Sequence, residues 1–115
     1  MAKTLMADGK SLIDRIGDYV SKVDAELGVE KAFIFGSTAK GNRLIESDVD
    51  LIIVSKAFKG MPQPRRLYLL QKLWCYRVDL QALAYTPEEF KKASERLIMR
   101  EILSYAIELL PLAED

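Results

Sequence analysis

Two aspartates, Asp48 and Asp50, are the residues of this sequence best suited to metal chemistry. They lie two positions apart where an apolar segment predicted to be a strand begins, so both side chains are expected on one face. Two carboxylates this close repel each other unless a cation lies between them. Mg²⁺ suits the pair, because it binds one or two carboxylates and completes its shell with water and phosphate oxygens. The alternative, a turn residue beside a merely solvated aspartate, is disfavoured because an unpaired charge within an apolar run is costly.

Gly36 and Ser37 form a second candidate site, ten residues before Asp48 in the sequence. They follow a predicted strand and precede a predicted short helix. Glycine lets the backbone approach a ligand closely, and Ser37 is expected to cap the short helix. Free N–H groups at such a turn, with the serine hydroxyl, are suited to phosphate. Taken alone, the two residues would be better explained by an ordinary strand–turn–helix with a serine cap.

The composition excludes several other chemistries. The 115 residues contain no histidine and one cysteine, so histidine bases, zinc–imidazole sites and intrachain disulfides are excluded. Lysine plus arginine and aspartate plus glutamate each total 17, and a neutral chain lacks the field that drives bulk nucleic-acid binding. No segment resembles a signal peptide or a membrane span. We therefore expect a cytoplasmic protein that uses oxygen ligands for any metal.

The elements that must position these residues follow a helix, strand, strand, helix, strand, helix order, which predicts an α/β class in one domain over residues 1–115. Leu12, Ile13, Ile16, Val20, Val23 and Leu27 recur at helical spacing before Gly28, with Ser11 and Asp14 as a capping pair. Strands are predicted over 31–35, 49–54 and 78–83, and helices over 65–74 and from Thr86 to about Leu110, the last with a break near Ser94. The start of this last helix is a predicted capping box, with Thr86 as N-cap and a following glutamate reaching back. The buried side of the 65–74 helix is expected to carry Leu67, Leu70, Leu73 and Trp74. Cys75 is expected to be packed among apolar neighbours.

The combination of Gly36-Ser37 with Asp48-Val49-Asp50 resembles the minimal nucleotidyltransferases of the DNA polymerase beta superfamily. The resemblance runs from about residue 33 to 83 and implies a polymerase beta-like palm, a small mixed sheet flanked by helices. It implies that Gly36 and Ser37 hold a nucleoside triphosphate and that Asp48 and Asp50 bind two Mg²⁺ ions.

The same resemblance implies that Asp79 is a third metal-binding and catalytic carboxylate, which would draw a proton from the attacking hydroxyl. By itself, a lone aspartate such as Asp79 in a strand is more often exposed polarity at the edge of a sheet. The family often has arginine directly after Gly-Ser, whereas this chain has Thr38. We therefore expect triphosphate binding to depend on Lys40 or Arg43, which otherwise would be plain surface cations.

The implied reaction is transfer of a nucleoside monophosphate from ATP to a hydroxyl, with pyrophosphate leaving. Proteins of this size resemble antitoxins that transfer AMP to a tyrosine of a HEPN-type RNase toxin. A binding module of the same fold with little turnover, and a transferase acting on a small-molecule hydroxyl, remain as alternatives.

The C-terminal segment carries more apolar residues than one helix stripe requires. We expect an exposed apolar face that pairs with a toxin or with a second copy of the chain. The alternative is a central helix packed on both sides. The residues concerned are Leu97, Ile98, Met99, Ile102, Leu103, Ala106, Ile107, Leu109 and Leu110.

Overall fold

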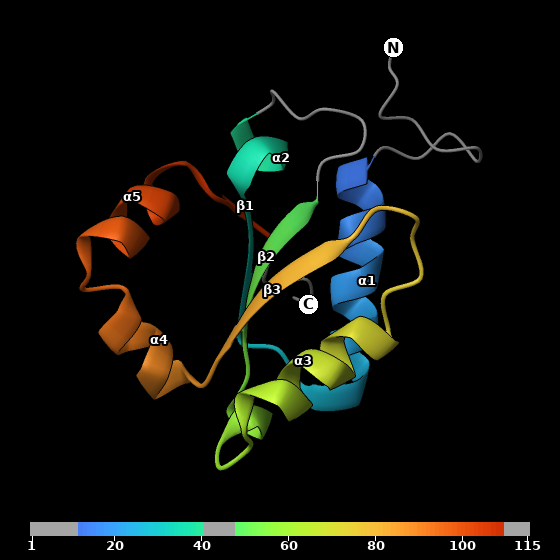
Figure 1. The fold of residues 1–115 in the computed structure, drawn as a ribbon, viewed down its shortest axis with the longest axis horizontal. Coiled ribbons are helices and arrows are strands. Elements are labelled where there is room, and N and C mark those ends of the chain that lie inside the picture. Colours follow the sequence, from blue (N-terminus) through green and yellow to red (C-terminus); the bar gives the residue numbers. More distant parts are fainter. Residues whose placement is uncertain (1–11, 41–47, 110–115) are drawn as a thin grey trace.

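The computed structural model describes residues 12–40 and 48–109. These form a four-stranded mixed sheet with helices on both faces, which confirms the predicted α/β class (Figure 1). In chain order the elements are α1 (Leu12–Leu27), β1 (Lys31–Phe35), α2 (Gly36–Lys40), β2 (Val49–Val54), the short 3-10 helix η1 (Lys56–Phe58), α3 (Gln63–Lys72), β3 (Leu80–Tyr85), α4 (Pro87–Ala93), α5 (Leu97–Tyr105) and β4 (Ile107–Glu108).

The sheet has the strand order β3-β2-β1-β4, which places β2 in its interior. Strand β2 pairs antiparallel with β1 and parallel with β3, and β4 pairs antiparallel with β1. One rung of the ladder runs through Phe35, Asp50 and Gln81, from β1 across β2 to β3. Strand β2 therefore places Asp50 between Phe35 of β1 and Gln81 of β3.

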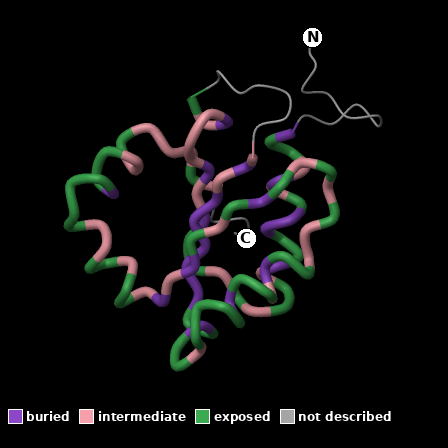
Figure 2. Tube along the Cα trace, viewed as in Figure 1, coloured by how far each residue is buried: buried purple, intermediate pink, exposed green. Residues whose placement is uncertain are grey.

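The two faces of β2 contact different cores, as its continuous apolar sequence predicts. Leu51 and Ile53 pack in the larger cluster with residues of α1 and α3, whereas Ile52 and Val54 pack with Met99 of α5. These four side chains of β2 are fully buried. Figure 2 shows the buried positions concentrated along the strands of the sheet. Because side chains alternate along a strand, Asp50 lies on the same face as Ile52, toward α4 and α5.

Helix α1 has the predicted bounds, and Gly28 follows it with a φ of 78°. Its buried stripe includes Tyr19, whose hydroxyl donates to the Leu70 carbonyl oxygen at 2.6 Å. Ile13 is outside this stripe and 40% exposed, contrary to its predicted place in it. The predicted capping partner Ser11 lies outside the described residues.

Helix α3 differs from its prediction in position and in its buried side. It runs from Gln63 to Lys72, two residues earlier than expected, and Pro62 is its N-cap. Leu67 is 37% exposed, whereas Arg66 is buried. The reason is that Arg66 has a carboxylate partner on α4, which spacing along one helix does not reveal. Cys75 is exposed rather than packed.

Strand β3 begins at Leu80 instead of residue 78, so Asp79 precedes the strand. The backbone before it has another role, because the indole N–H of Trp74 donates to the Val78 carbonyl oxygen at 2.7 Å. Two outward carbonyl groups of β3, those of Leu80 and Ala84, also accept hydrogen bonds from side chains of α3. Gln71 donates to Leu80 at 2.8 Å, and both Gln63 and Arg66 donate to Ala84.

The C-terminal segment breaks near Ser94, as predicted, but its second helix ends at Tyr105. The predicted continuation of the helix to Leu110 is wrong. Ile107 and Glu108 instead pair with β1, and the Leu109 N–H donates to the Ala32 carbonyl oxygen at 2.8 Å. The free edge of β1 supplies hydrogen bonds that a helical continuation would leave unmade.

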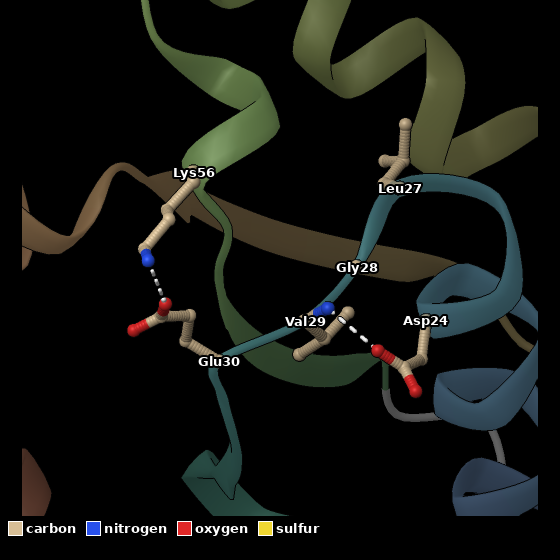
Figure 3. A pocket seen from close by; sticks show the side chains of 6 residues that line it. All are labelled: Asp24, Leu27, Gly28, Val29, Glu30 and Lys56. Atoms are coloured by element: carbon tan, nitrogen blue, oxygen red, sulfur yellow. Dashed lines mark hydrogen bonds and ion pairs between the residues drawn. The ribbon is translucent and has the colours of Figure 1, made fainter.

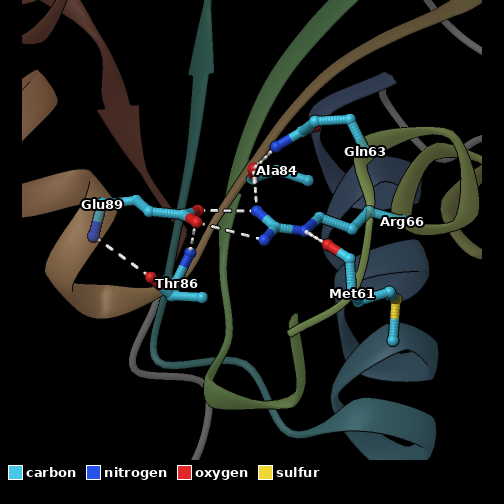
Figure 4. A network of polar contacts seen from close by, with 6 residues as sticks. All are labelled: Met61, Gln63, Arg66, Ala84, Thr86 and Glu89. Carbon is cyan, nitrogen blue, oxygen red and sulfur yellow. Dashed lines mark hydrogen bonds and ion pairs between the residues drawn. The ribbon is translucent and has the colours of Figure 1, made fainter. Parts of the chain in front are cut away.

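A network around Arg66 attaches α4 to the rest of the fold (Figure 4). The Arg66 guanidinium forms a bidentate pair with Glu89, at 2.6 and 3.1 Å, and also donates to the carbonyl oxygens of Met61 and Ala84. Glu89 simultaneously accepts from the Thr86 N–H at 3.0 Å, and the Thr86 hydroxyl accepts from the Glu89 N–H. This is the capping box that the sequence predicts, and it shares its carboxylate with a buried cation.

We predict that Glu89→Gln lowers the free energy of unfolding by about 1–2 kcal/mol at pH 7, because the buried Arg66 loses its charged partner. Nearly half of the Glu89 side chain is exposed, so water replaces part of the contact. The hydrogen bond from Arg66, with that from the Thr86 backbone, holds the pKa of Glu89 below its usual value. Because this pKa is lowered in the folded state, the ionised Glu89 stabilises the protein above the ordinary glutamate pKa of about 4.3. This stabilisation is lost as the pH falls below that value.

Urea unfolding at pH 7 and pH 3.5 measures this effect, with Glu88→Gln as the control at a neighbouring exposed glutamate. The stability gap between wild type and Glu89→Gln should narrow at pH 3.5. An equal gap at both pH values would show that the pair does not contribute in its ionised form.

Candidate active site

The paired aspartates lie where β2 begins. Asp50 is the second residue of β2 and its one polar position, and Asp48 comes just before the strand. Both side chains are half-buried. Burial raises the pKa of Asp50, and the charge of Asp48 raises it further. The carboxylates are therefore close enough to repel each other, as their spacing predicts.

Gly36 lies directly against the carboxylate of Asp50. It follows Phe35, which is the register partner of Asp50, and its backbone has a φ of 70°. A Cβ atom at this position would collide with Oδ2 of Asp50 and lie 3.1 Å from its Cγ. Two constraints thus require glycine here: the left-handed backbone and the absence of space for a side chain.

Helix α2 carries the other predicted phosphate contacts. It begins at Gly36, so Ser37 lies within its first turn and not at the predicted N-cap position. Thr38 is buried, and its hydroxyl has no hydrogen-bond partner within the described residues. Lys40 ends the helix, with its ammonium 4.7 Å from the centre of the Tyr105 ring on α5. Arg43 lies outside the described residues.

Asp79 directly precedes β3, and within residues 12–40 and 48–109 only its backbone is hydrogen-bonded. Its carbonyl oxygen accepts from the Val49 N–H at 2.8 Å, while its side chain is exposed. Val49 is opposite Leu80 in parallel register, so one step further places Asp79 beside Asp48. Over residues 12–40 and 48–109, no three acidic or cysteine side chains gather closely enough to hold a metal ion together.

A residue that the sequence analysis missed is Gln81. It is the β3 partner of Asp50, and its side-chain Nε2 donates to Oδ2 of Asp48 at 3.1 Å. Its spacing of two from Asp79, on one strand face, was the available signal. The site thus offers two adjacent half-buried carboxylates and the amide of an exposed glutamine. Such hard oxygen donors fit Mg²⁺, which retains water and takes its remaining ligands from phosphates.

An open hollow at the other end of the β1–β2 ladder does not share these features (Figure 3). Its charged groups already serve the chain's own contacts. Lys56 pairs with Glu30 at 3.3 Å, and Asp24 accepts from the Val29 N–H at 2.7 Å beyond the end of α1. The chemistry therefore concentrates at the Asp50 end of the sheet.

A family model for the nucleotidyltransferase domain matches residues 16–113, a range that contains the carboxylate pair and the Gly36 turn. The chain belongs to the nucleotidyltransferase domain family. Members of this family generally use a nucleoside triphosphate and a divalent metal, so the chain is a transferase that acts on a nucleotide.

A solved structure gives independent support to this nucleotidyltransferase fold. The chain is similar to a candidate nucleotidyltransferase from Sulfolobus solfataricus, with 26% sequence identity and a TM-score of 0.58 over 70% of this chain and 72% of that one. No curated protein is significantly similar in sequence. None of the nucleotidyltransferase's described helices has the length and apolar character needed to cross a membrane.

We predict that Asp50→Asn stabilises the metal-free nucleotidyltransferase at pH 7. Because the pKa of Asp50 is raised in the folded state, the folded protein binds more protons, and stability falls as pH rises above the ordinary aspartate pKa of about 3.9. Asparagine removes this cost, and each 1 kcal/mol relieved raises Tm by about 4 °C in a domain this size.

Thermal unfolding in EDTA between pH 4 and pH 8 measures the difference, with Glu26→Gln on the exposed side of α1 as the control. Added Mg²⁺ should reverse the order, because it stabilises only the variant that keeps both carboxylates. A lower Tm of Asp50→Asn in EDTA throughout this range would contradict the inferred repulsion.

Proposed function

We propose that this nucleotidyltransferase transfers AMP from ATP to a hydroxyl, and that the acceptor is a tyrosine of a HEPN-domain toxin that it silences as an antitoxin. The observation that carries the transferase part is the contact between Gly36 and Asp50. It sets a turn suited to phosphate against a carboxylate pair suited to a divalent cation. The adenine base, the tyrosine and the toxin rest on the resemblance to minimal nucleotidyltransferases.

In the proposed site, Asp48 and Asp50 hold Mg²⁺, with two ions in the full complement and Asp79 as a further ligand. Bound Mg²⁺ would polarise the α-phosphate and stabilise the charge of the leaving pyrophosphate. Gly36 and Ser37 contact the triphosphate through the backbone and hydroxyl of α2.

Lys40 and Arg43 are proposed to neutralise part of the triphosphate's negative charge. The Tyr105 ring restrains the Lys40 ammonium near α2 through a cation–π contact. A restrained cation loses less conformational entropy when phosphate binds than a free surface lysine would.

The proposed transfer forms one bond and breaks one. The acceptor oxygen attacks the α-phosphorus, and the bond from that phosphorus to the bridging oxygen of the β-phosphate breaks. The acceptor's proton passes to the Asp79 carboxylate, and the electron pair of the broken bond leaves with pyrophosphate. Asp79 is exposed and, by extension of the β2–β3 register, lies beside Asp48. An incoming hydroxyl can therefore reach it.

An alternative is a nucleotide- or toxin-binding module with weak turnover. Asp48, Asp50 and Asp79 do not form a three-carboxylate centre within the described residues, and this favours the binding module. Catalytic contacts are, however, often loose before substrate binds. A transferase moves the α-phosphate of ATP to the acceptor, whereas a binding module leaves the bound nucleotide intact.

Transfer of label from α-phosphate-labelled ATP to a purified HEPN-domain protein tests the proposal. We expect Asp50→Asn to lose the Mg²⁺-dependent transfer, and Asp79→Asn to lower its rate about 10²–10⁴-fold with little change in triphosphate affinity. Glu26→Gln serves as the control. Tight triphosphate binding by wild type without transfer would favour the binding module, and full transfer by Asp50→Asn would refute the site.

The partner is proposed to bind at the start of α5, where Leu97 is 81% and Ile98 is 70% exposed. Five other apolar residues of this segment pack in the two cores: Met99, Ile102 and Leu103 in the smaller one, and Ile107 and Leu109 against the larger one. Leu110 lies outside the described residues. The face available for pairing is therefore narrower than the sequence predicts. A second copy of the chain is the other proposed occupant.

We predict that Ile98→Glu weakens association with the partner, or self-association, by at least tenfold, because it places a charge in a desolvated contact. Tyr68→Glu, at a 59% exposed aromatic on α3, is the matched control. Light scattering over a dilution series, with and without the partner, measures both variants. Unchanged association by Ile98→Glu would exclude this surface.

A further inference from the structure

Gln81 makes a contact between two strands that the proposed chemistry does not yet use. It lies opposite Asp50 in the parallel β2–β3 ladder, yet its amide reaches Asp48, one step along the same face, at 3.1 Å. The register fixes this reach, because six consecutive residue pairs hold β3 against β2. Gln81 is exposed, so apolar packing does not account for its position.

The direction of this hydrogen bond follows from the chemistry of the two groups. An ionised carboxylate can only accept, so the amide nitrogen faces Asp48 and the amide oxygen points elsewhere. The contact occupies Oδ2 of Asp48 and leaves the other carboxylate oxygen unbound by Gln81. A lysine at this position would compete with a metal ion through its own charge, and a glutamate would add a third repelling carboxylate. Glutamine supplies a donor without either effect.

We propose that Gln81 is a positioning residue of the divalent-metal site, which holds one oxygen of Asp48 so that the other is presented to the cation. This inference rests on the proposed metal site of Asp48 and Asp50. Outer contacts of this kind fix the orientation of a ligating carboxylate, and their loss weakens metal binding about 10–100-fold. Gln81 contributes no charge of its own to the site.

Binding of Mn²⁺, as a paramagnetic substitute for Mg²⁺, tests the role without requiring a substrate. Titration followed by the electron paramagnetic resonance of free Mn²⁺ gives the Kd directly. Gln81→Leu should weaken binding about 10–100-fold while leaving Tm in EDTA within about 2 °C of wild type, since an exposed side chain contributes little to stability. Gln81→Asn keeps the amide but shortens its reach, and should also weaken binding.

Gln71→Leu is the matched control, because Gln71 donates to the Leu80 carbonyl oxygen on the outer edge of the same strand. It should lower Tm without changing the Mn²⁺ Kd. Equal Mn²⁺ affinity of wild type and Gln81→Leu would overturn the positioning role while leaving the metal site intact. Failure of wild type itself to bind Mn²⁺ would overturn the metal site, and this inference with it. Equal weakening by Gln71→Leu would show a general effect of β3 and also overturn the specific role.

Discussion

Burial of β2 on both faces is the constraint on which the rest of the structure depends. Its last four side chains belong to two separate cores, and both of its edges are paired. A shift of one residue would exchange the two cores and place Asp50 in an apolar cluster. The carboxylate is thus fixed by the packing of its neighbours, and Gly36 follows from it, because only glycine fits beside a carboxylate held there.

The opposing requirements of folding and chemistry meet at Asp50. Burial and the nearby charge of Asp48 raise its pKa, so the metal-free fold carries an electrostatic cost at neutral pH. The buried residues that follow it in β2 compensate for this cost with apolar contacts. A bound cation would relieve the repulsion between the two carboxylates, which makes the free energy of cation binding more favourable. The fold can therefore favour metal binding with few protein ligands.

Much of this arrangement was predictable where the signal is local. The bounds of β1, β2 and α1 are as predicted, and the predicted capping box forms at Thr86. These signals are local, because apolar periodicity and cap chemistry act over a few residues. Errors arose where a distant partner decides. Arg66 is buried instead of Leu67 because it pairs with Glu89, which is 23 residues away in the sequence. Strand β4 forms because the edge of β1 is available for pairing. Gln81 was missed for the same reason, since its hydrogen bond depends on strand register.

The side chains that α3 extends to the rim of β3 have a consequence for assembly. The outward carbonyl groups of Leu80 and Ala84 are already bound by Gln71, Gln63 and Arg66, and the opposite rim is the two-residue β4. A sheet whose rims are covered or short offers little template for an added strand. Growth of this sheet into intermolecular or amyloid-like ribbons is thereby discouraged, and recognition of other molecules is left to side chains.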